Sequence, residues 1–166
     1  IYIRSACSAT SYSSWNVAIP FVTVISIPSA CQINIPLKDN GTETFLLDVD
    51  EKGILGKDVF IDGIDLIVSH DWPADLKIIL ESPQGQQVTL SNHNGTVKDD
   101  FGDIHDNTCT KVTTFAAGAC LSLKNGSPPY IGAFRPDGDM EMWRLDTLSK
   151  GFWKLICNWL IPKIHG

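Results

Sequence analysis

Short runs in which apolar and polar residues alternate dominate this sequence and restrict the folds open to it. A period of two places successive side chains on opposite faces of a β-strand, and no long window carries the apolar stripe of an amphipathic helix. Asn-Gly, Pro-Gln-Gly, Pro-Pro and Pro-Asp-Gly sequences separate the runs. Strands are expected at about residues 17–27, 33–37, 43–49, 58–68, 76–81, 86–91, 111–115, 119–123, 141–145, 152–157 and 159–164.

The dominance of these alternating runs, without a helical stripe, predicts an all-β fold. Many short strands with turns between them are typical of a sandwich, whereas a parallel sheet needs helical crossovers that this sequence does not offer. We therefore expect a jelly-roll-like antiparallel β-sandwich over residues 33–166. An N-terminal extension over residues 1–32 precedes it and contributes an extra apolar strand segment.

Composition and charge exclude several classes of function. The 166 residues are 43% hydrophobic and 19% charged, which is sufficient for one globular core. A net charge of -6, without any cluster of Lys and Arg, disfavours binding to nucleic acid or to an anionic membrane. Residues 17–28 are too short to span a bilayer and contain Pro20, so no membrane insertion is expected. Since the chain begins at Ile1 without a signal peptide, we expect a processed form or a fragment.

Five cysteines are present, and none of their spacings is a close Cys-x-x-Cys pair. Disulfides are therefore expected, with the pairs chosen by proximity. Cys109 with Cys120 would close a long acidic loop, and Cys7 with Cys31 would clamp the N-terminal extension. Cys157 is then left over. Other pairings of the five remain open.

Three Asn-Gly-Thr/Ser sequences fit the pattern for N-glycosylation, at Asn40, Asn94 and Asn125. Asn-Gly is also simple turn chemistry, and both interpretations place these residues at the surface. Together with the expected disulfides, the three sites favour a secreted, extracellular protein.

Residues 69–90 hold the side-chain types of a hydrolase, namely Ser69, His70, Asp75 and Ser82. A serine hydrolase needs its base within hydrogen-bond reach of the serine, and no Gly-x-Ser-x-Gly elbow is present. We expect no catalytic residue here. Instead, Trp72 is expected to close one end of the core, and the Asp75 carboxylate to accept hydrogen bonds from turn amides.

An acidic segment raises the possibility of a metal site. Asp99, Asp100 and Asp103, with Asp75, offer oxygen ligands of the kind that Ca²⁺ takes, with Asn94 and Asp106 as further donors. The spacing fits no EF-hand loop, and an ordinary solvated acidic loop is the alternative. A weaker zinc hypothesis uses His93, His105, Cys109 and Cys120.

Tryptophan is the other residue type with two interpretations. The five tryptophans, Trp15, Trp72, Trp143, Trp153 and Trp159, are expected mainly in the core, with stacking on carbohydrate as the alternative.

A series of motifs resembles a known family. The motifs are Ile35-Pro36, Asp39-Asn40-Gly41, Leu47-Asp48-Val49, Gly53-Ile54, Asp58-Val59, His70-Asp71-Trp72-Pro73-Ala74-Asp75-Leu76, Leu80-Glu81-Ser82-Pro83-Gln84-Gly85, Gly132-Ala133-Phe134-Arg135-Pro136-Asp137-Gly138 and Gly151-Phe152-Trp153-Lys154-Leu155. In this order, over residues 33–157, they resemble the P domain of proprotein convertases and related secreted bacterial proteases. The resemblance implies a non-catalytic module that lies beside a protease domain and stabilises it or helps it engage substrate.

The C-terminal end departs from the family pattern. Cys157 stands where the family usually has Asp, and Asn158-Trp159-Leu160-Ile161 follows without the usual hairpin loop. Residues 152–157 and 159–164 therefore form one long strand, or else the sandwich lacks its last strand. A missing strand would expose sheet edges, which residues 17–27 could cover within their own chain or in the next subunit. The second arrangement implies an extracellular filament or surface subunit, whose partners are identical subunits. A carbohydrate- or calcium-binding module is a third interpretation.

Overall fold

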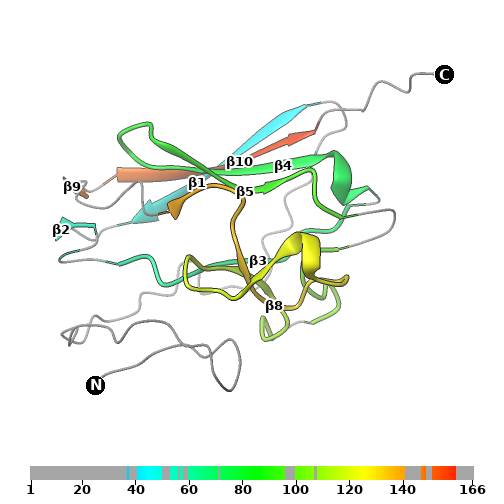
Figure 1. Ribbon diagram of the computed structural model, residues 1–166. Coiled ribbons are helices and arrows are strands. Elements are labelled where there is room, and N and C mark those ends of the chain that lie inside the picture. Colours follow the sequence, from blue (N-terminus) through cyan, green and yellow to red (C-terminus); the bar gives the residue numbers. More distant parts are fainter. Residues whose placement is uncertain are drawn as a thin grey trace, which may run out of the picture.

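The computed structural model describes residues 37, 41–49, 53–55, 57, 60–70, 72–95, 100–106, 108–140, 147–148 and 151–159. Strands in two four-stranded sheets and one two-stranded sheet account for nearly all of its regular structure, and its helices are short 3-10 turns. In Figure 1 the two larger sheets lie as layers, with β4, β5 and β10 in one and β3 and β8 in the other. The expected all-β sandwich is confirmed.

The first sheet is antiparallel throughout. It consists of β1 (Thr42–Val49), β10 (Gly151–Trp159), β4 (Leu76–Glu81) and β5 (Gln87–Asn92), in the order β1-β10-β4-β5. Alternate residues of β1 are exposed and partly buried, as the period-two pattern predicts for a strand with one face on a core. On the outer face, the Lys154 ammonium and the Glu81 carboxylate lie 2.6 Å apart across neighbouring strands.

The second sheet is mixed, which differs from the uniformly antiparallel arrangement that the sequence suggested. Its strands are β3 (Ile64–Leu66), β6 (Thr113–Phe115), β8 (Gly132–Arg135) and β7 (Leu121–Ser122), in the order β3-β6-β8-β7. β8 runs parallel to both β6 and β7. Two short elements, β2 (Gly53–Ile54) and β9 (Thr147–Leu148), form a separate antiparallel pair. The 3-10 helices η1 (Pro73–Asp75) and η2 (Leu123–Asn125) complete the fold.

Most of the expected strands that fall on described residues are present, with some changes of length. The expected strand at 58–68 is reduced to β3, with an isolated bridge from Val68 to Phe101. At the C-terminal end, β10 covers the expected strand at 152–157 and runs without interruption to Trp159. The expected strands at 17–27, 33–36 and 141–145, and residues 160–164, lie outside the described residues.

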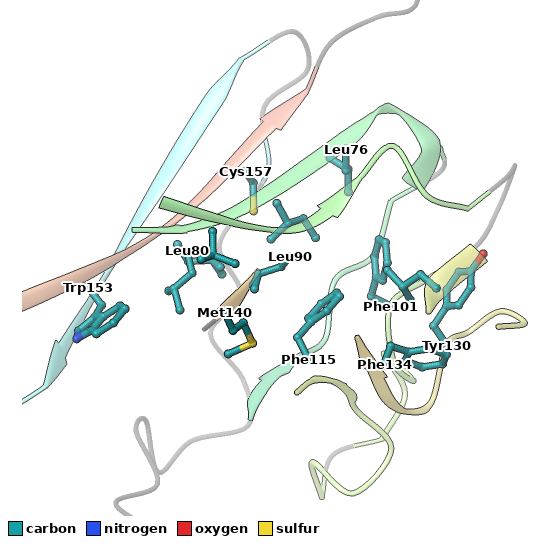
Figure 2. Packing of buried hydrophobic residues seen from close by; sticks show 14 of the residues in the cluster. Leu76, Leu80, Leu90, Phe101, Phe115, Tyr130, Phe134, Met140, Trp153 and Cys157 are labelled. Atoms are coloured by element: carbon teal, nitrogen blue, oxygen red, sulfur yellow. The ribbon is translucent and has the colours of Figure 1, made fainter. Parts of the chain in front are cut away.

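The core lies between the two layers. Figure 2 shows Leu76, Leu80 and Leu90 of the first sheet facing Phe115, with Met140 beside them. Phe101, Tyr130 and Phe134 form an aromatic group at one side, in which the Phe101 and Tyr130 ring centroids are 5.6 Å apart. Phe101 and Phe115 are fully buried, which makes these large side chains the main filling of the sandwich.

Candidate functional site

Residues 69–90, which resemble a hydrolase site in composition, form the connection into the first sheet and its β4–β5 hairpin. Pro73 begins η1, and the Asp75 amide donates to the Trp72 carbonyl. Ser82 is buried, and its hydroxyl accepts a hydrogen bond from the Gln86 amide at 3.2 Å. The turn therefore uses the Ser82 hydroxyl to hold its own backbone.

The histidine of this stretch also has a local structural role. His70 Nδ1 accepts a hydrogen bond from the Trp72 amide at 3.0 Å, and the His70 amide donates to Asp100. In the described part of the chain, neither Ser69 nor Ser82 is hydrogen bonded to a histidine. Nothing in this geometry activates a serine as a nucleophile.

The acidic loop binds its own backbone and side chains. The Asp106 carboxylate accepts hydrogen bonds from the amides of Thr108, Thr110 and Lys111 and from both threonine hydroxyls. These donors, the Thr108 hydroxyl first, hold the pKa of Asp106 well below its ordinary value. The His105 amide, followed by the Lys111 ammonium at 3.0 Å, lowers the pKa of Asp103 in the same way.

The carboxylates proposed for calcium are not brought together by the described residues. Asp100 accepts from the His70 amide and Asp103 is paired with Lys111, while Asp99 lies outside the described residues. Asp75 is 9% exposed, and no donor in the described part of the chain bonds its carboxylate, contrary to the expected bonds from turn amides. No group of three acidic, His or Cys side chains within the described residues has a metal-binding arrangement. Calcium binding stays a prediction without geometric support.

The cysteines fall into two classes. Cys109 and Cys120 are both disulfide-bonded, which excludes them as the thiolate ligands of the zinc hypothesis. Their pairing with each other stays a prediction, and Cys7 and Cys31 lie outside the described residues. Cys157 is a free thiol on β10 whose burial raises its pKa to about 11. A protonated, buried thiol of this kind packs as a small apolar side chain.

The three glycosylation sequences have different surroundings. Asn125 is exposed at the end of η2, and Asn40 lies outside the described residues. The expected surface position is wrong for Asn94, which is only 4% exposed. Its Nδ2 donates to Asp137 Oδ2 at 2.6 Å and to Ser91 Oγ at 3.2 Å. The nitrogen that would carry a glycan is therefore enclosed by protein.

Asp137 is the residue that sequence reasoning missed. One of its carboxylate oxygens also accepts from the Asn92 amide at 2.8 Å, so a single side chain holds both the end of β5 and the buried Asn94. The Pro-Asp-Gly sequence indicates only a turn, and the partner residues are more than 40 positions away.

Two tryptophans show opposite environments. Trp153 is buried in the core, as expected, whereas Trp72 is 49% exposed and does not close the end of the sandwich. The neighbouring Pro73 fills that interior position instead. Trp15 and Trp143 and the side chain of Trp159 lie outside the described part of the structure.

One open hollow of about 290 Å³ lies at the turn after β6 and the loop after β8. Its lining residues are Ala117, Gly118, Arg135, Pro136, Gly138, Asp139 and Met140. Its lining contains no serine, histidine or cysteine, and its charged side chains are those of Arg135 and Asp139.

Part of the chain matches a known protein family. Residues 63–119, about a third of the chain, match the family model of the proprotein convertase P-domain. No curated protein and no solved structure matches the chain. No helix among the described residues is long and apolar enough to cross a membrane. The matched residues run from the start of β3 through β4, β5 and β6, so this part of the β-sandwich is similar to the proprotein convertase P-domain.

Proposed function

We propose that this chain is a non-catalytic P-domain module of an exported protein and that its role is to pack against and stabilise a protein partner, in the first instance a protease domain. One observation carries the proposal. The family-matched segment 63–119 supplies a large part of the interior of the sandwich, including Leu76, Leu90, Phe101 and Phe115. Within it, the Ser82 and His70 side chains accept hydrogen bonds from nearby backbone amides. We therefore attribute the function of the module to the surface that it presents to a protein partner.

Export is supported by two features of the described residues. Cys109 and Cys120 are disulfide-bonded, and disulfides persist mainly in oxidising compartments. Asn125 offers an exposed glycosylation sequence. A disulfide and an exposed glycosylation sequence are both expected of a secreted module.

A chimera tests the stabilising role. The P domain of a convertase is replaced by this chain, and hydrolysis of a fluorogenic peptide by the secreted product is compared with that of the convertase lacking any P domain. We expect the chimera to be active and the deletion to be inactive. In the matched control, Phe115→Ala within the chimera opens a cavity in the module and reduces activity. A chimera that is as inactive as the deletion, with the module folded by circular dichroism, would contradict the proposal.

The second candidate function is a filament or surface subunit that assembles by donating residues 17–27 to a neighbouring copy. The observation that favours it is the outer edge of β1, which no described strand covers. Regular fibres in negative-stain electron microscopy that disappear when residues 1–32 are removed would support this function. Discrete monomers in both samples would exclude it.

A further inference from the structure

The open hollow of about 290 Å³ has two walls that come from different parts of the chain. One wall is the turn after β6, with Ala117 and Gly118, and the other is the segment 135–140 after β8. Met140 is the buried member of the lining, and Figure 2 shows it beside Phe115 in the core. Sites for small ligands usually measure about 300–1,000 Å³, so this hollow has the size for one or two side chains of a partner.

Backbone hydrogen bonds fix both walls. The Ala116 amide donates to the Phe134 carbonyl at 3.0 Å, and the Ala119 amide donates to the Ala116 carbonyl at 3.1 Å. On the other side, the Gly138 amide donates to the Thr89 carbonyl at 2.7 Å. The hollow is therefore formed before any ligand arrives, and binding requires little ordering of the backbone.

The two charged side chains of the lining differ in their availability. Arg135 ends β8 with an exposed side chain, and no described carboxylate pairs with its guanidinium. Asp139, in contrast, already interacts with another group of the chain. The Arg135 guanidinium is thus the charged group of the hollow that is available to a ligand.

A guanidinium next to an apolar floor suits a carboxylate at the end of a short carbon chain. The planar fork of Arg matches the two oxygens of a carboxylate and forms charge-assisted hydrogen bonds with them. Met140 and Pro136 offer apolar contact to the methylene groups of such a ligand. The opposite wall leaves room for it, because a Cβ at Gly118 would meet nothing within 4 Å.

We propose that the hollow is a docking site for an acidic side chain, a glutamate in the first instance, and that Arg135 binds its carboxylate. This names the chemistry of the protein partner and in that respect rests on the proposed function. Asp139 on the same lining and the net charge of -6 repel ligands that carry many negative charges. The site therefore favours a single carboxylate on a protein surface, which adds to a larger interface.

A peptide titration followed by amide NMR spectra of the nitrogen-labelled full chain tests the proposal. The probe is acetyl-Ala-Glu-Ala-amide, and the matched neutral probe is acetyl-Ala-Gln-Ala-amide. We expect the Glu peptide to shift the amide signals of Ala117, Gly118 and Gly138 saturably at millimolar concentrations. The Gln peptide should bind at least about tenfold more weakly, because a hydrogen bond to a charged group is replaced by a neutral one.

Variants assign the binding to the hollow. Arg135→Ala should weaken the Glu peptide by about tenfold and make the two peptides equivalent. Gly118→Trp places a large side chain on the open wall and should weaken both peptides. Lys57→Ala removes the same charge at an exposed position outside the lining and should change neither affinity. If Arg135→Ala loses the dispersed spectrum of the folded chain, Arg135→Gln repeats the test with a longer side chain.

Three results would overturn the inference. The first is the absence of saturable shifts at the lining amides, and the second is equal binding of the Glu and Gln peptides. The third is unchanged binding by a folded Arg135 or Gly118 variant, which would place the peptide elsewhere. The titration uses no protease, so an inactive chimera with positive titration would reject the stabilising role and leave the site. An active chimera with negative titration would reject the site alone.

Discussion

Among single residues, Asp137 joins segments that are far apart in the sequence. Its carboxylate bonds the Asn92 amide and the buried Asn94 side chain, which also reaches Ser91. In Asn94→Ala the buried Ser91 hydroxyl loses a partner, and so does the carboxylate of Asp137, which is exposed. We expect the free energy of unfolding to fall by about 1–3 kcal/mol, measured by chemical denaturation. Asn125→Ala, at an exposed position, should change it by less than about 0.5 kcal/mol. Equal effects of the two would refute the role of the Asn94 contacts.

The enclosure of Asn94 also determines which of the N-glycosylation sequences can be glycosylated. A glycan is attached through the amide nitrogen that here donates to Asp137 and Ser91. We expect glycopeptide mapping of the folded protein from a eukaryotic secretory host to find Asn125 occupied and Asn94 unmodified. Occupancy of Asn94 in correctly folded material would show that this end of β5 has another arrangement.

Because of Asp106, we expect the folding stability of the protein to depend on pH. Because five donors lower its pKa in the folded state, the folded chain binds fewer protons than the unfolded chain below pH about 4. The contribution of Asp106 is therefore present above this pH and is lost as the pH falls. We expect Tm to fall between pH 5 and pH 3, and to fall less in Asp106→Asn. An identical fall in both proteins would place the acid sensitivity elsewhere.

Among the structural elements, the segment that covers β5 offers a sharp test. A Cβ at Gly138 would lie 2.9 Å from the Thr89 nitrogen and 3.1 Å from its oxygen, while one at Gly118 would meet nothing within 4 Å. Gly138→Ala should therefore lift this segment from β5 and cost about 1–3 kcal/mol. Gly118→Ala is the matched control, with a change between zero and a stabilisation of about 1 kcal/mol. Thermal unfolding of both variants measures the difference, and equal stabilities would contradict the close contact.

Strands with clear alternation were predictable from the sequence, and strands without it were not. The expected strands at 43–49 and 76–81 correspond closely to β1 and β4. β8 was missed because its four residues include a glycine and only one buried side chain, Phe134. The parallel pairing of β8 with β6 and β7 arises from tertiary packing and leaves no local signal.

Around the candidate site, the sequence indicated local turns such as Pro-Gln-Gly, where the Gly85 amide donates to the Ser82 carbonyl. The Ser82 turn is formed by residues within four positions of each other. The position of Asn94 was predicted wrongly, because Asn-Gly indicates an exposed turn while its partner Asp137 lies 43 residues away. A contact between residues this far apart in the sequence can be predicted only when the fold is known.

The whole molecule depends on its last described strand. β10 pairs with β1 on one side and with β4 on the other, and it contributes Trp153, Leu155 and Cys157 to the core. A chain that ends at Lys150 lacks the middle of the first sheet, so we expect it to show no cooperative thermal unfolding. The full chain refolded in parallel is the control. A cooperative transition in the shortened chain would mean that β1 and β4 close the gap themselves.

The central position of β10 also has a consequence during synthesis on the ribosome. β1, β4 and β5 emerge first, yet the strand that joins β1 to β4 is the last described one to be made. Until it arrives, β1 and the β4–β5 hairpin present unsatisfied backbone groups and uncovered apolar side chains to the surroundings. A nascent chain of this protein is therefore vulnerable to aggregation until β10 has emerged, and a holding chaperone would act chiefly before residue 151 appears.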